Sequence, residues 1–269
     1  MFQCPTTVDE WNVCAERGTE WNFPYAVGAL GGKQMYIHRP GNASQVPGLS
    51  NYRGSYSIIM LALVDGDYKF IYFDVTAARR AGDAGVWKRC SLRKAIENGR
   101  LNLPPPACLP GTNSSVPHIL TADNAFPLTP YVMTPYKGHT LGPDQTVFNV
   151  RLSRHQSLVE NAFGMLCQRF GGVFRGSTSL DPHSMVDTVC ACLCLHNMLR
   201  SQEIARQTGQ THSEPGNVGL SQGGGTSALK RLRAPSGRPS TRAETRRRLG
   251  EVERDKFTAY FVSPEGSVP

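Results

Sequence analysis

The sequence lacks the features of a membrane-spanning or disulfide-stabilised protein. None of its apolar stretches approaches the roughly 18–20 residues that a membrane helix needs. The first residues, MFQCPTTVDEWN, contain neither a basic segment nor an apolar core, which argues against a signal peptide. Without such a signal, eight cysteines in 269 residues are not typical of a disulfide framework. We therefore expect neither membrane attachment nor a fold stabilised by disulfides.

A zinc motif is also missing, although three cysteines lie close together. On a helix, Cys190 and Cys194 share one face while Cys192 points elsewhere, and there is no second pair of cysteines to complete a tetrahedral site. We interpret them as buried, reduced thiols.

The charge of the chain has an excess of one sign. Lys and Arg number 29 against 21 Asp and Glu, so the formal net charge is +8 and the isoelectric point is about 9.2. Residues 1–200 and 201–269 each carry +4 of this excess. A mean hydropathy of −0.33 with 39% hydrophobic residues excludes a chain that is disordered throughout. The charge favours an anionic partner such as nucleic acid.

The order of apolar segments predicts an α/β fold with three strands at its start. We expect strands at 26–38, 55–64, 68–75 and 117–122, and helices at 85–98, 152–170 and 184–201. Asp65-Gly66-Asp67 separates two apolar runs, which is a hairpin signal. Ser184 and Asp187 are spaced as a capping box for the last helix. We find no internal repeat.

Two carboxylates follow elements from which they could meet. Asp123 ends a predicted strand, and Glu160 lies on the next predicted helix. Two-metal hydrolysis of a phosphodiester needs carboxylates that converge from distant segments, and their hard oxygens suit Mg²⁺ or Mn²⁺. The spacing alone equally fits a turn residue at a strand end and a solvated helix face.

The words around these acids resemble the Harbinger-type DDE transposase family and its domesticated nuclease relatives. The matching words, in chain order, are Trp21-Asn22-Phe23-Pro24, Gly28-Ala29-Leu30, Tyr52-Arg53-Gly54, Phe73-Asp74-Val75, Asp123-Asn124-Ala125-Phe126-Pro127-Leu128, Pro135-Tyr136, Phe148-Asn149-Val150-Arg151-Leu152-Ser153-Arg154, Val159-Glu160-Asn161-Ala162-Phe163-Gly164, Arg169-Phe170, Leu195-His196-Asn197 and Tyr260-Phe261. The resemblance covers roughly residues 20–200 and the end of the chain.

The resemblance implies an RNase H-like DDE nuclease core, a mixed sheet flanked by helices, that cleaves DNA with divalent metal ions in the nucleus. By position, the second acid of the triad is Asp123 and the third is Glu160. An additional metal-associated acid of the family corresponds to Asp83, which could instead cap the following helix.

The first acid of the triad is replaced. The family word Gly-Ala-Ile-Asp-Gly-Lys-His here reads Gly28-Ala29-Leu30-Gly31-Gly32-Lys33-Gln34, so Gly31 stands at the position of the acid. The loss of a ligand that commonly bridges both metals predicts impaired or absent strand cleavage. Asp65 lies near the same strand, but its Asp-Gly-Asp setting favours a turn.

Basic residues near the predicted site are candidates for contacts with DNA phosphates. They are Arg79, Arg80, Lys88, Arg89, Arg93, Arg151 and Arg154. An ordinary solvated helix face would also explain them. His196 and Asn197 lie in an apolar helix, where we expect a core histidine and an asparagine that bonds the backbone.

Four segments follow from composition and resemblance. Residues 1–23 form a lead-in, 24–202 the endonuclease domain, 203–228 a flexible Gly/Ser-rich linker and 229–269 a flexible basic C-terminal tail whose aromatic end could dock. No helix-turn-helix precedes the catalytic segment, so relative to the family the chain looks truncated at its N-terminus. Related transposases use an upstream recognition region or a separate Myb-like partner protein, and an oligomer is compatible with the sequence.

Three functions remain open at this level. The first is a nuclease impaired by Gly31. The second is a catalytically inactive DNA- or chromatin-binding protein derived from a transposase. The third is a decayed copy of an element.

Overall fold

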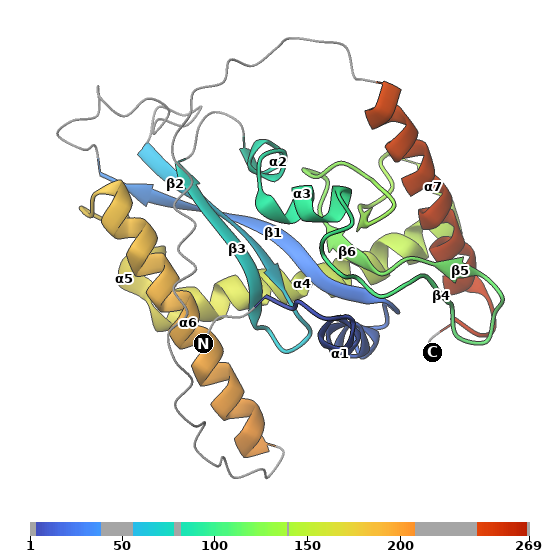
Figure 1. Ribbon diagram of the computed structural model, residues 1–269, viewed down its shortest axis with the longest axis horizontal. Coiled ribbons are helices and arrows are strands. Elements are labelled where there is room, and N and C mark those ends of the chain that lie inside the picture. Colours follow the sequence, from blue (N-terminus) through green and yellow to red (C-terminus); the bar gives the residue numbers. More distant parts are fainter. Residues whose placement is uncertain (1–3, 39–55, 78–81, 139, 208–240, 268–269) are drawn as a thin grey trace.

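A computed structural model describes residues 4–38, 56–77, 82–138, 140–207 and 241–267 of the chain. These residues form a five-stranded sheet, in the order β3-β2-β1-β6-β7, with helices on both of its faces (Figure 1). The strands are β1 Ala26–Ile37, β2 Tyr56–Val64, β3 Phe70–Ala77, β6 Ile119–Ala122 and β7 Val132–Met133. β1 pairs with β2, and β2 with β3, in antiparallel fashion, whereas β1–β6 and β6–β7 are parallel. This mixed sheet confirms the predicted α/β, RNase H-like class.

The first hairpin is built as the sequence predicts. Residues 65–69 turn between β2 and β3, and Asp65 Oδ1 accepts hydrogen bonds from the backbone N–H groups of Asp67 (3.0 Å) and Lys69 (2.9 Å). Burial raises the pKa of Asp65 to about 6. Asp65 is therefore occupied in holding a turn and does not replace an acid on β1.

One face of the sheet is covered by α4 (Pro143–Arg169), with the short α5 (Gly171–Phe174) and α6 (Pro182–Gln207) beside it. Val159, Phe163 and Leu166 of α4 are spaced as one apolar stripe of the helix and pack on the sheet. α4 begins at Pro143, well before the predicted position 152. Proline is favoured in the first turn of a helix because the N–H groups of that turn have no acceptor within the helix, so the N–H that proline lacks is not missed. Pro143 therefore starts the helix.

The opposite face is covered by α1 (Val8–Thr19), α2 (Gly82–Trp87) and α3 (Ser91–Glu97). The single helix predicted at 85–98 is thus two short ones, because Cys90 has extended backbone and its Sγ accepts the N–H of Arg93. α1 was not expected within the lead-in 1–23. Its start carries a capping box between Thr7 and Glu10, and its Trp11 is fully buried, so these residues belong to the core.

The start of α6 differs from the prediction as well. The capping group is Asp181, whose Oδ1 accepts the N–H groups of His183 (3.0 Å) and Ser184 (3.2 Å), and the predicted Ser184–Asp187 box is wrong. Near its middle, His196 Nε2 lies 2.9 Å from the carbonyl oxygen of Tyr68. Asn197 binds both backbone groups of Phe70, at 2.9 and 2.8 Å. Both side chains have the structural roles that the sequence suggests.

The C-terminal segment departs from the expected flexible tail. α7 (Thr241–Val262) packs along the β7 side of the core, where Phe257 and Phe261 are buried against Phe23 and Phe148 (Figure 1). Arg254 lies 3.8 Å from the centre of the Tyr136 ring and donates to the Thr134 carbonyl at 3.3 Å. α6 also continues through 203–207, the first residues of the predicted linker. Residues 208–240 lie outside the described part of the chain.

Two further strands, β4 (Ala107–Cys108) and β5 (Ser115–Val116), form a small hairpin beside α7. Within the described ranges, no helix combines the length and apolar character needed to cross a bilayer.

Acidification is expected to destabilise this fold through His155 of α4. Burial lowers the pKa of His155 to about 3, whereas an unfolded histidine titrates near 6.5. Below that pH the unfolded chain binds the proton first, so stability falls by about 1.4 kcal/mol per pH unit until the folded pKa is reached. Urea unfolding of the native protein and His155→Gln between about pH 7 and pH 5 checks this. The variant must show the shallower loss toward acid, and equal slopes would contradict the assignment.

Candidate active site

The carboxyl end of β6 places the first of the predicted acids. β6 lies parallel to β1 with Ala122 opposite Leu30, so Asp123 leaves the sheet beside the Gly31-Gly32 pair of β1. Asp123 is exposed, and its Oδ1 accepts the N–H of Ala125 at 2.8 Å, which closes a tight turn. Asp123 is therefore a turn residue, as one interpretation of the sequence predicts. The turn uses Oδ1 and not Oδ2, so it is compatible with a role of Asp123 as a metal ligand.

Asp83, in the first turn of α2, lies directly over β1. A β-carbon added to Gly32 would collide with the carboxylate of Asp83, so the carboxylate fills the space above that glycine. Burial, and after it the charge of Asp123, raises the pKa of Asp83. The structure thus brings Asp123 close enough to Asp83 for its charge to raise the pKa of Asp83.

Replacing Gly32 by alanine is expected to lower the free energy of unfolding by about 1–3 kcal/mol, because the new methyl group displaces Asp83. Gly164→Ala in α4 is the matched control. Its β-carbon meets open space, and the change should raise stability by about 0.5–1 kcal/mol. Chemical unfolding measures both. Native stability in Gly32→Ala would show that Asp83 does not rest on this strand.

Glu160 is held apart from this pair. It is exposed on α4, and its neighbour Val159 packs on the sheet face opposite to α2. Gly31 points to that same face, because its added β-carbon would lie 2.9 Å from both methyl groups of Val159. Alternation along β1 therefore directs position 31 toward α4 and position 32 toward Asp83.

The described residues do not fit a two-metal site. Among them, no three His, Cys, Asp or Glu side chains gather closely enough to hold a metal ion. The carboxylate pair of Asp83 and Asp123 has the hard oxygens that Mg²⁺ or Mn²⁺ prefers, but Glu160 does not complete it.

The predicted DNA-contacting residues have different environments. Lys88, Arg89 and Arg154 are exposed, while Arg93 pairs with Glu97 at 2.8 Å. Arg151 is used within the protein: its guanidinium lies 4.5 Å from the Phe261 ring centre, and it donates to the Phe261 carbonyl at 3.5 Å. This contact anchors α7, so the structure gives Arg151 a structural role. Arg79 and Arg80 lie outside the described residues.

The sequence was compared with known proteins. Residues 30–197, which include Asp83, Asp123 and Glu160, match the family model described as DDE superfamily endonuclease. The chain belongs to this family. A relative from Arabidopsis thaliana, described as "Protein ALP1-like", is 29% identical over 168 residues, which are 61% of this chain and 39% of the relative. The chain thus spans about two fifths of the length of the curated relative it matches. No solved structure matches it.

Membership of the DDE endonucleases confirms the resemblance to Harbinger-type transposases and their nuclease relatives. Such endonucleases generally use divalent metals, and carboxylate oxygens like those of Asp83 and Asp123 are the ligands that these metals prefer. The family resemblance pointed to Asp83 in the sequence, but the role of Gly32 was missed. The sequence feature that could have shown this role is the pair of glycines in β1. Only a glycine at position 32 leaves room for the carboxylate of Asp83 from α2.

Proposed function

We propose that this chain is a transposase-derived DDE nuclease domain that acts on DNA and whose divalent-metal-dependent cleavage of phosphodiester bonds is impaired. The supporting observation is the site itself: Asp83 and Asp123 lie together at the ends of α2 and β6, while position 31 of β1, which faces α4 and so the helix of Glu160, carries no side chain. Removal of a bridging acid takes away the charge that would hold a second cation, and with it most stabilisation of the transition state.

A plasmid-nicking assay tests this proposal. The purified protein, given Mg²⁺ or Mn²⁺, should nick supercoiled DNA slowly or not at all. Asp123→Ala and Glu160→Ala are compared with Asp144→Ala, which removes an exposed acid from the first turn of α4. Rapid nicking that both site variants abolish and Asp144→Ala preserves would show a competent nuclease and refute the impairment.

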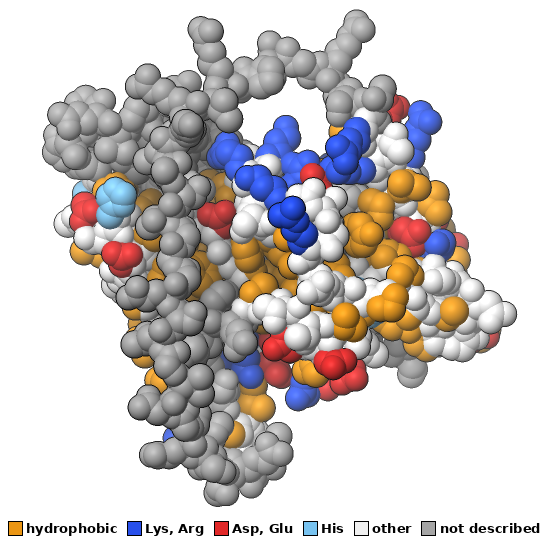
Figure 2. All heavy atoms as spheres, viewed as in Figure 1, with side chains coloured by type: hydrophobic (Ala, Val, Ile, Leu, Met, Phe, Trp, Pro, Cys, Tyr) orange, Lys and Arg blue, Asp and Glu red, His pale blue; other side chains and the backbone are white. Residues whose placement is uncertain are grey.

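A DNA-binding protein without catalysis is the second candidate. It is favoured by the cations that α3 and α7 expose on one side of the molecule, because binding of phosphates by these cations needs no metal ion (Figure 2). Because phosphate contacts release counterions, its affinity should be insensitive to chelation and should fall steeply with salt. A nuclear location and a Myb-like partner protein belong to either proposal and follow from the family resemblance.

A further inference from the structure

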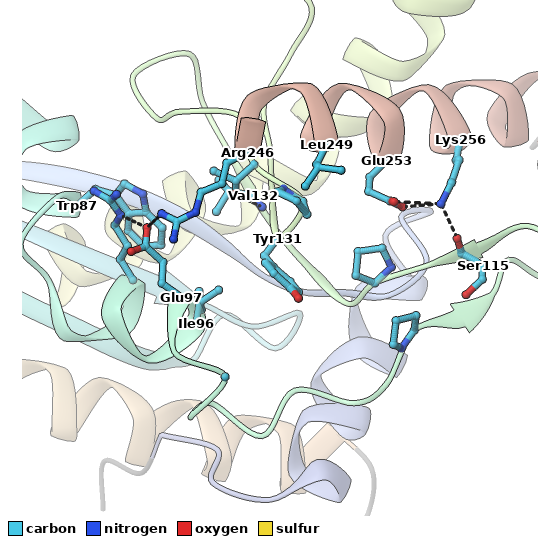
Figure 3. A pocket seen from close by; sticks show the side chains of 16 residues that line it. Trp87, Ile96, Glu97, Ser115, Tyr131, Val132, Arg246, Leu249, Glu253 and Lys256 are labelled. Atoms are coloured by element: carbon cyan, nitrogen blue, oxygen red, sulfur yellow. Dashed lines mark hydrogen bonds and ion pairs between the residues drawn. The ribbon is translucent and has the colours of Figure 1, made fainter. Parts of the chain in front are cut away.

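A groove runs between α3 and α7 and continues past the loop that leads into β7. Its central cavity has a volume of about 710 Å³ (Figure 3). A neighbouring cavity shares Ile96, Pro117 and Tyr131 with it, and another along α7 shares Lys256. The three cavities are therefore neighbours on the surface of the protein.

The floor of this groove is apolar and exposed. Tyr131 is 40% exposed and Leu249 52%, and in Figure 3 Leu249 projects from α7 toward the loop that carries Tyr131. Val252, one turn further along α7, is 53% exposed. Large apolar side chains in such a cluster mark a surface on which a ligand rests.

Both lips of the groove are cationic. Figure 2 shows Lys and Arg side chains gathered where α2, α3 and the first turns of α7 meet. The cations that line the groove are Arg93 on one lip and Arg246 and Lys256 on the other, and Lys88, Arg89, Lys94, Arg100 and Arg242 are further exposed cations of the same part of the molecule. Glu97 joins the lips, since it pairs with Arg93 of α3 and with Arg246 of α7. On α7, Glu251 pairs with Arg247 and Glu244 pairs with Arg248. The cations of this helix start still outnumber its acids.

The groove also shares α2 with the candidate site. Trp87, which lines it, ends the same helix that Asp83 begins, and its ring lies 6.1 Å from that of Phe126. Phe126 follows the turn at Asp123, and the chain then continues to Tyr131. The groove is thus linked to the carboxylate pair through α2 and through the segment that runs from Asp123 to Tyr131.

We propose that this groove binds one unpaired strand of DNA, with its phosphates on the cations of the two lips and a base against Tyr131 and Leu249. A duplex offers phosphates to cations but keeps its bases stacked inside, so its bases cannot contact the apolar floor of the groove. Basic tracks with an exposed aromatic are how proteins hold single strands. The proposal rests on the proposed action of the domain on DNA and specifies the form of DNA that it takes.

Fluorescence anisotropy with a labelled oligodeoxythymidine and a labelled blunt duplex tests the groove, in EDTA so that nothing is cleaved. Tyr131→Ala should weaken binding of the single strand about tenfold, the loss of one stacked base, and leave duplex binding almost unchanged. Leu249→Ala, which removes a half-exposed side chain, should act in the same direction without affecting folding.

The salt dependence tests the lips. Replacing Arg246 and Lys256, which line the groove, together by alanine should reduce the slope of log affinity against log salt for the single strand by about 1.4, about 0.7 for each lost phosphate contact. Replacing Arg175 and Arg206, exposed cations beside and on α6, removes the same charge away from the groove and should leave the slope unchanged.

Native affinity for the single strand in Tyr131→Ala and Leu249→Ala overturns the proposal and assigns the groove to a protein partner. An equal loss for single strand and duplex also overturns it, since the floor would then not distinguish the two. Binding of the native protein to duplex alone refutes the groove and leaves the proposed function intact, whereas binding to neither DNA refutes both.

Discussion

Phe257→Ala lowers the free energy of unfolding by about 3–5 kcal/mol, the usual cost of deleting a large aromatic from a packed core. Phe257 is fully buried although it lies only twelve positions from the last residue of the sequence. Its ring is 5.3 Å from Phe23, which precedes β1, and 6.1 Å from Phe261. The cavity left by alanine would be shared between the start and the end of the chain.

Urea unfolding of the full chain measures this effect. Leu249→Ala, two turns earlier on the same helix and 52% exposed, is the matched control and should change stability by no more than about 0.5 kcal/mol. If both variants unfold at the same urea concentration as the native protein, α7 is not docked and the C-terminal segment is the mobile tail that composition alone suggests.

Restoring a carboxylate on β1 is the second large effect. The Gly31→Asp change should raise metal-dependent nicking about 100-fold, comparable to the contribution of one well-placed electrostatic group. The structure adds a requirement to this experiment. A side chain at position 31 starts 2.9 Å from the methyl groups of Val159, and a branched side chain has little freedom to move aside. The change is therefore made together with Val159→Ala.

The control for this experiment carries Gly31→Ala with Val159→Ala, which has the same β-carbon and the same enlarged space without the carboxylate. The comparison separates charge from packing. Equal nicking by the two double variants, with both folded, would mean that position 31 is not where the fold needs its first acid.

Much of the sheet follows from the sequence because it depends on local signals. The Asp-Gly-Asp turn and its two flanking β-rich runs define the β2–β3 hairpin, and Asn197 and His196 have the buried structural roles that their apolar helix suggests. The sequence did not predict the first residues of α4 and α6, because Pro143 and Asp181 start these helices. Proline and aspartate are equally common in turns, so the residue type alone does not identify a helix start.

The rest depends on contacts between distant segments. α1 is short and polar on average, and only its position under the sheet explains why Trp11 is buried. α7 has an Arg-rich sequence that resembles a solvated helix, yet the aromatics of its last turns complete a core formed by residues more than a hundred positions earlier. In the candidate site, the motif identified Asp83 and Asp123, but only strand alternation shows that positions 31 and 32 face opposite sides of the sheet.

The hydrogen bonds of Asn197 have a consequence for solubility. β3 is an edge strand of the sheet, and an unpaired edge invites a second molecule to add its own strand and begin aggregation. The amide of Asn197 binds the outward N–H and C=O of Phe70, as an incoming strand would. At the other edge, β7 has two residues and lies beside α7. Asn197 thus blocks the Phe70 end of one edge against intermolecular β-pairing, and α7 lies against the short strand at the other.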